Sequence, residues 1–153
     1  MDIWTKIWRL FTEPELVEAE ERYRPLMLPL HNGWYPTSDP DGNELVNIAR
    51  LRITGTIFSY FGSVPSEVIP KLVKGESLIL APDPQNKVDH EAIRVFTNKL
   101  KYIGWVPRSY VRKGDIFRRL MAGKYVCCVV LDHGVVQYES SPWCEIGIAT
   151  YEE

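Results

Sequence analysis

The chain has 153 residues, enough to bury about two-thirds of the surface that its unfolded form would expose. Its 45% hydrophobic and 25% charged residues are typical of a water-soluble globular protein, which disfavours a disordered chain. The three cysteines do not indicate a disulfide framework, and no apolar run is long enough to cross a bilayer. The N-terminus lacks the basic region and the small-residue cleavage site that a leader would have. We therefore expect one cytoplasmic domain with an appendage and no membrane partner.

The net charge of −2 hides an uneven distribution along the chain. Residues 47–125 contain fourteen Lys or Arg and six Asp or Glu, a net charge of +8, whereas residues 1–46 and 126–153 each carry −5. Clustered positive charge attracts phosphate backbones even when the whole protein is nearly neutral. The distribution fits a nucleic-acid partner, and it also fits an ordinary solvated surface in which the signs happen to segregate.

Residues 1–46 are expected to form a helical extension followed by a Pro-rich loop. Near the start, apolar residues recur at three- and four-residue spacing, which indicates one helix: Ile3, Trp4, Ile7, Trp8, Leu10 and Phe11. Thr12, Pro14 and Glu15 are typical of the start of a second helix. These helices can pack on the main domain, form a dimer contact or lie on a membrane surface, and packing is favoured. In the loop that follows, Trp34 and Tyr35 are expected to dock onto the protein.

Residues 47–153 are expected to form a mainly β domain. Short apolar or alternating runs separated by turns predict strands, at residues 46–58, 78–81, 92–96, 101–106, 125–131 and 144–151. Two helices are predicted, at residues 66–73 and 110–122. Strands of this length and spacing are typical of a barrel or a sandwich. We interpret them as a small OB-like β-barrel with two or more flanking helices.

The most specific pattern lies in the middle of the chain. The run LILAPDPQNKVDHEAIRVF begins at Leu78, and YIGWVPR follows from Tyr102 to Arg108. This combination resembles the HIRAN domain over roughly residues 48–130. Members of that family occur in DNA-repair translocases and alone in bacteria and phages. The resemblance implies a nucleic-acid-binding module, with single-stranded DNA favoured, that acts in repair or replication and catalyses no reaction.

The resemblance also implies a role for the polar loop of this pattern. Asp89 matches the family's aspartate that recognises the free 3′ hydroxyl of a single strand, because a carboxylate accepts a hydrogen bond from a hydroxyl and repels a phosphate. Asn86 either contributes to the same recognition or, with Asp83, only holds the turns of the loop. Val88 replaces an aromatic residue of eukaryotic relatives. General binding of nucleic acid depends less on that position than strict 3′-end capture does.

Aromatic and basic residues complete the predicted site, because a base stacked on a ring gains roughly 1–3 kcal/mol without a sequence requirement. Trp105 is the preferred stacking residue, since it is expected to face away from Ile103. Phe58 and Tyr60 are further aromatic candidates, and Phe61 and Tyr102 are weaker ones. Arg108 is expected to reach a phosphate or a base, and the remaining electrostatic candidates are Arg52, Lys87, Arg94 and Arg112.

Other classes of protein fit the sequence less well. The histidines and cysteines lack the spacing of a metal site, and no phosphate-binding Gly loop or nucleophile elbow is present. We expect no enzyme activity, metal or cofactor. The alternative is a protein-interaction module that has lost DNA binding and that contacts a partner through its N-terminal helices or its acidic tail.

Overall fold

The computed structural model describes residues 30–31, 34–60, 62–136 and 141–152. The two helices predicted before residue 25 lie outside these ranges, and the boundary between residues 46 and 47 stays a prediction. Within the described ranges the chain is mainly β, as the sequence predicts. No helix there has the length and apolar character that a membrane crossing requires.

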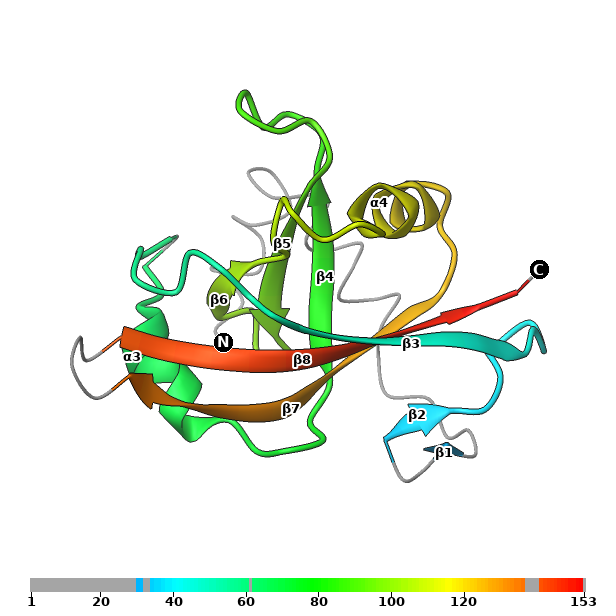
Figure 1. The fold of residues 1–153 in the computed structure, drawn as a ribbon, viewed down its shortest axis with the longest axis horizontal. Coiled ribbons are helices and arrows are strands. Elements are labelled where there is room, and N and C mark those ends of the chain that lie inside the picture. The colour runs from blue at the N-terminus through cyan, green and yellow to red at the C-terminus, as the bar shows by residue number, and fades with distance from the viewer. Residues whose placement is uncertain (1–29, 32–33, 61, 137–140, 153) are drawn as a thin grey trace, which may run out of the picture.

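One three-stranded antiparallel sheet is built from strands that are distant in the sequence, in the order β3-β8-β7. Its members are β3 (Leu45–Arg52), β7 (Val126–Val136) and β8 (Ser141–Tyr151). β7 and β8 form a long hairpin that runs across the front of the molecule in Figure 1. In β3 every second side chain is exposed, so this strand has one face toward the protein and one toward water.

The second sheet has the order β4-β5-β6 and contains the predicted nucleic-acid motif. Its members are β4 (Leu78–Asp83), β5 (Ala92–Thr97) and β6 (Tyr102–Trp105). β4 and β5 pair from Leu78 opposite Thr97 to Asp83 opposite Ala92. All six side chains of β5 are buried, and four of them are apolar, whereas Arg94 and Thr97 are buried polar residues. The loop between β4 and β5 projects beyond the body of the protein (Figure 1).

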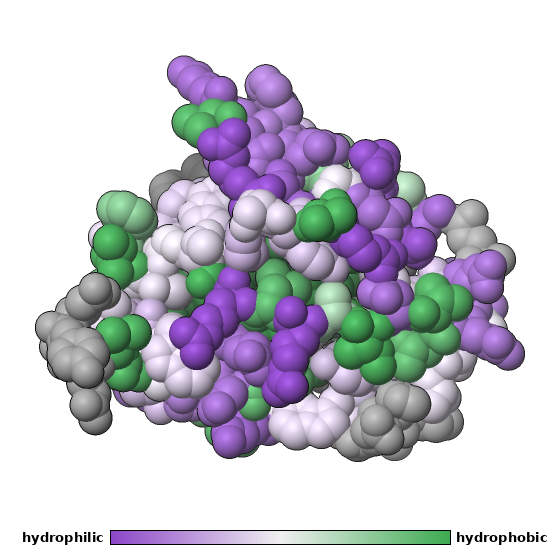
Figure 2. Space-filling model, in the orientation of Figure 1, coloured by the Kyte–Doolittle hydropathy of each residue, from purple (hydrophilic) through white to green (hydrophobic). Residues whose placement is uncertain are grey.

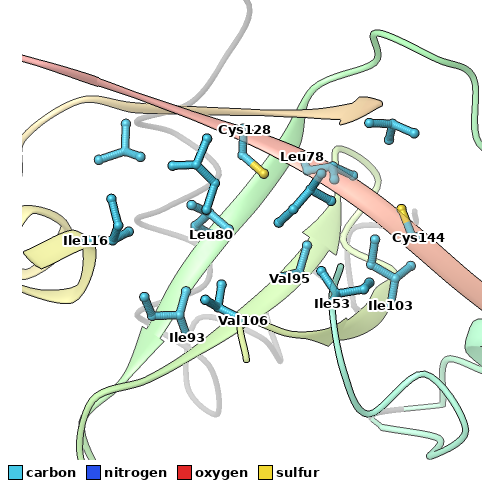
Figure 3. Close-up of a cluster of buried hydrophobic side chains, with 14 of the residues drawn as sticks. Ile53, Leu78, Leu80, Ile93, Val95, Ile103, Val106, Ile116, Cys128 and Cys144 are labelled. Carbon is cyan, nitrogen blue, oxygen red and sulfur yellow. The ribbon is translucent and has the colours of Figure 1, made fainter. Parts of the chain in front are cut away.

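The main core lies between the two sheets and under helix α4 (Lys113–Met121). Ile93 of β5, Ile146 of β8 and Leu120 of α4 are at most 1% exposed and belong to one hydrophobic cluster. Figure 3 shows aliphatic side chains of both sheets converging there, together with Cys128 and Cys144. This core fixes the position of α4 relative to the ends of β4 and β5.

The prediction of an OB-like barrel is wrong in its closure. The described strands form two separate three-stranded sheets and a two-stranded ribbon, β1 (Leu30–His31) with β2 (Tyr35–Pro36), rather than one barrel. The sheets are linked only by isolated backbone bridges among the described residues, Thr54 with Trp105 and Ser77 with Val129. After Thr54 the chain turns at Gly55, whose φ is +73°. The described helices are short: α4, and α3 (Pro65–Val68) with the 3₁₀ turn η1 (Ile69–Lys71).

The expected docking of Trp34 and Tyr35 is confirmed. Tyr35 is 5% exposed and packs with residues of β7 and β8, and a side chain at Gly147 would overlap its hydroxyl group. Burial raises the pKa of Tyr35 to about 12. The Trp34 ring lies against Gly75, so this stretch of the Pro-rich segment is part of the folded unit.

Candidate nucleic-acid interface

The β4–β5 loop is held by its own polar side chains. Asn86 Oδ1 accepts hydrogen bonds from the backbone N–H groups of Val88 (2.9 Å) and Asp89 (3.0 Å). The Asn86 N–H donates to the Asp83 carbonyl at 3.1 Å, and the Ala92 N–H donates to the Asp89 carbonyl at 3.1 Å. Asn86 therefore has the turn-holding role that the sequence allowed, and it fixes the backbone from which Asp89 projects.

Asp89 is engaged on both carboxylate oxygens. Its Oδ1 accepts a hydrogen bond from the Glu91 N–H at 3.0 Å, and its Oδ2 accepts one from Lys113 Nζ at 2.6 Å. Arg108 Nε lies 4.0 Å from the same Oδ2. The Asp89 side chain is 17% exposed, and each carboxylate oxygen has a second lone pair. The residue can therefore accept a further hydrogen bond from a ligand.

The surroundings of Asp89 keep it ionised. Partial burial opposes the charged form, but the hydrogen bond from Lys113 and the backbone bond from Glu91 outweigh it, with a smaller contribution from Arg108. The net effect is a pKa of Asp89 below its ordinary value. At neutral pH the group is an acceptor only, which suits recognition of a hydroxyl donor.

Trp105 faces away from Ile103, as predicted, but a bulge produces this orientation. Phe96 pairs with Tyr102 and Val95 pairs with Gly104, so Ile103 is an extra residue on β6. Strict alternation would place positions 103 and 105 on one face, whereas the bulge sends Ile103 into the main core and Trp105 to the opposite face.

The Trp105 ring is held by an aromatic cluster. It makes edge contacts with Tyr60 and Tyr102, with ring centroids 6.3 Å apart in both pairs. Gly55 lies directly against the indole, since a Cβ there would be 2.8 Å from Trp105 Cδ1. Burial raises the pKa of Tyr102 to about 12, although a hydrogen bond with the Trp105 side chain opposes the shift. The indole is therefore fixed before any ligand binds.

Four predicted site residues meet at one hollow of about 180 Å³. Its lining includes the predicted residues Asn86, Asp89, Trp105 and Arg108, together with Thr54, Val88, Ala92 and Val106. The volume is below the roughly 300–1,000 Å³ of a drug-sized pocket. The hollow thus joins an aromatic ring, an ionised carboxylate and an exposed guanidinium in a space suited to a single base or sugar.

A second hollow, of about 530 Å³, lies on the other side of Asp89 and Arg108, which line both. Its lining adds three cations, Arg112, Lys113 and Arg118, and the acids Glu91 and Asp115. Figure 2 shows hydrophilic side chains over the projecting loop and the region of α4. Because they share Asp89 and Arg108, the two hollows together extend from Trp105 to α4.

Comparison with known proteins identifies the family of the chain. The HIRAN domain family matches residues 48–152, more than two-thirds of the chain. The chain belongs to the HIRAN domain family. This family is a group of nucleic-acid-binding modules, so the coarse functional class of the chain is binding of nucleic acid. No curated protein sequence matches the chain.

Two solved structures are similar to this HIRAN chain. The HIRAN domain of human HLTF is 18% identical with a TM-score of 0.51, and the match covers 74% of this chain and 84% of that one. A protein from Lactobacillus plantarum is 14% identical with a TM-score of 0.49, and the match covers 69% of this chain and all of that one. At this identity the match to the human domain shows a shared fold.

The other predicted site residues of the HIRAN chain lie outside the smaller hollow. Phe58 is 64% exposed on the turn that follows Gly55, and Tyr60 packs against the Trp105 edge. Arg94 is 3% exposed and donates to the Pro82 carbonyl and the Tyr60 hydroxyl, which places it beneath the aromatic cluster.

Three basic candidates remain at the edges of this region. Arg52 lies on β3 with its guanidinium 4.3 Å from the centre of the Trp143 ring. Lys87 is exposed on the projecting loop. Arg112 lines the larger hollow, where it pairs with Asp115 at 3.0 Å. Their roles in binding, like those of Phe58 and Tyr60, stay predictions.

Thr54 and Lys113 are lining residues that sequence reasoning did not single out. Thr54 enters the smaller hollow because its backbone pairs with that of Trp105, a contact between sheets that no local pattern reveals. Lys113 reaches Asp89 across twenty-four positions, and the only signal was its place in a basic run at the start of a predicted helix. Among the described residues, no group of His, Cys, Asp and Glu is suited to hold a metal ion.

Proposed function

We propose that this protein binds single-stranded DNA at a strand end, with the last base against Trp105 and the terminal 3′ hydroxyl at Asp89. The supporting observation is the shared hollow in which Asp89, Trp105 and Arg108 meet. In this proposal the protein binds DNA and makes or breaks no covalent bond. The family resemblance suggests DNA repair or replication as the context. The proposal concerns DNA ends, which is narrower than the nucleic-acid binding of the family.

Each of these side chains has a distinct task. The fixed indole of Trp105 offers a stacking surface that is tolerant of sequence. Arg108 is 71% exposed, and at 4.0 Å its Nε is beyond hydrogen-bond distance of a carboxylate that already binds Lys113, so its guanidinium is available to a phosphate. The ionised Asp89 accepts a hydrogen bond from the terminal hydroxyl. A duplex interior has no free hydroxyl at this position, so the arrangement favours an end.

Fluorescence anisotropy with labelled oligonucleotides tests the proposal. Two strands share one sequence: one has a free 3′ end, and in the other a stable hairpin closes the 3′ end. We expect the full chain to bind the free-ended strand at least about tenfold more tightly, since the hairpin pairs the last base and thereby keeps that base and its terminal hydroxyl out of the smaller hollow. Asp89→Ala is expected to remove most of this preference.

The matched control is Asp41→Ala, which changes an exposed aspartate on a turn before β3. This variant should bind like the unmodified protein. Equal affinity for both strands would reduce the function to general single-strand binding, and the absence of binding at low salt would favour the protein-interaction alternative.

A further inference from the structure

Asp89 has a buried cationic partner that a simple hydroxyl acceptor does not require. Lys113, the first residue of α4, donates from Nζ to Asp89 Oδ2 at 2.6 Å and to the Glu91 carbonyl at 3.0 Å. Its side chain is only 9% exposed. A lysine this buried is retained with its charge only when it is paired and hydrogen-bonded, and here both conditions are met.

Lys113 changes the charge that a DNA end would meet. Asp89 contributes one negative charge, whereas Lys113 and Arg108 contribute two positive charges within 4.0 Å of the same carboxylate oxygen. A lone carboxylate would repel a terminal phosphate, but this group of three carries a net charge of +1. The repulsion that would restrict the site to hydroxyl ends is therefore cancelled.

The space next to Asp89 is also suited to a phosphate. The larger hollow begins at Asp89 and Arg108 and contains Lys113 in its lining, whereas Trp105 lines only the smaller one. An ammonium group has three N–H donors, and among the described residues Lys113 has two acceptors, so one donor remains for a ligand. A phosphate attached to the terminal sugar can thus extend from the smaller hollow into the larger one, whose lining has four cationic and three acidic side chains and a net charge of +1.

We infer that Lys113 is a specificity-determining residue that lets the end site accept strands ending in a 3′ phosphate as well as in a 3′ hydroxyl. The inference rests on the proposed binding of strand ends. It adds to the ligands of the site the phosphorylated ends that strand cleavage can leave. It attributes the acceptance of these ends to the Lys113 side chain. Lys113 acts through the charge of Asp89 and by direct attraction to the added phosphate.

The decisive quantity is the ratio of the dissociation constant for a 3′-phosphate strand to that for the same strand with a 3′ hydroxyl. For the unmodified full chain we expect a ratio below about five. Lys113→Met removes the charge, keeps a long side chain and should raise the ratio at least fivefold, because the phosphate then faces an uncompensated carboxylate. Lys113→Arg keeps the charge, so its ratio should be closer to that of the unmodified protein than the ratio of Lys113→Met. Lys99→Met, a change at an exposed lysine on the β5–β6 turn, is the matched control.

Asp89→Asn gives a second test with the opposite sign and does not depend on the stability of the Lys113 variants. It removes the negative charge, keeps an acceptor oxygen and leaves Lys113, so the ratio should fall below that of the unmodified protein. The inference is wrong if the ratio exceeds five in the unmodified protein, or if neither Lys113→Met nor Asp89→Asn changes the ratio. In either case the proposed function still holds as long as free-ended strands bind better than hairpin-capped ones. If capped and free strands bind equally, the proposed function fails as well.

Discussion

Thr54 and Trp105 exchange both of their backbone hydrogen bonds, with N···O distances of 2.9 Å and 2.8 Å. This pair joins the end of the β3 segment to β6, and thereby one sheet to the other. It also brings Thr54 into the hollow that Trp105 lines. The preferred stacking residue is therefore fixed by a contact between sheets.

Gly104 makes this contact possible, and its replacement by alanine should weaken it. A Cβ at position 104 would lie 2.5 Å from the Thr54 carbonyl oxygen and 2.9 Å from Ile53 Cδ1. Because a backbone atom cannot move aside cheaply, we expect Gly104→Ala to cost about 1–3 kcal/mol of unfolding free energy. Thermal or urea denaturation followed by circular dichroism measures the loss. Gly42→Ala, at a turn where a Cβ meets nothing within 4 Å, is the control for backbone strain alone, and an equal cost in both variants would contradict the steric explanation.

Trp105→Ala should reduce the affinity of the protein for single-stranded DNA. The substitution removes the stacking surface from the smaller hollow, and we expect a loss of about 1–3 kcal/mol in binding free energy. Anisotropy titration of the free-ended strand measures this loss. Trp105→Phe keeps an aromatic face and should retain part of the affinity. If Trp105→Ala binds as tightly as the unmodified protein, bases do not stack at this position.

The sequence predicted the second sheet well because its strands are short, apolar and bounded by turn residues. The predicted ranges 78–81 and 92–96 differ from β4 and β5 by two residues or fewer at each end. β7 extends five residues beyond its prediction, because Asp132, His133 and Gly134 are atypical of a strand interior but pair with β8 in the long hairpin. Local composition cannot anticipate that partner.

The candidate site was predictable where its residues share one motif, and less so where they meet through tertiary contacts. Asn86, Asp89, Trp105 and Arg108 lie within 23 positions of the chain and line one hollow. The prediction of a closed barrel was wrong because the pattern of a strand indicates its length and its buried face but not which strand edges pair.

Arg108→Ala should weaken binding to all single strands and make it less sensitive to salt. The Arg108 side chain is 71% exposed, and its contact with Asp89 is as long as 4.0 Å, so stability should change by less than about 0.5 kcal/mol. Loss of one phosphate contact should reduce the slope of log affinity against log salt by about one. Anisotropy titrations at several salt concentrations measure the slope. Arg50→Ala, with an equally exposed side chain on β3 that pairs with Glu145, should leave the slope closer to that of the unmodified protein.

The stability that ionised Asp89 provides should depend on pH. Burial opposes the charge of Asp89, but its bonds with Lys113 and Glu91 lower the pKa in the folded state. The unfolded chain, with a pKa of about 3.9, then takes up the proton first as the pH falls. The contribution is therefore fully present above that value and is lost as the pH falls through the folded pKa. We expect Asp89→Asn to be less stable than the unmodified protein at pH 7, with a smaller difference at about pH 3, in urea unfolding followed by circular dichroism. Asp41→Asn, at an exposed turn, controls for the general loss of charge. A difference for Asp89→Asn that stays constant or grows toward acid would show that the ion pair with Lys113 does not stabilise the fold.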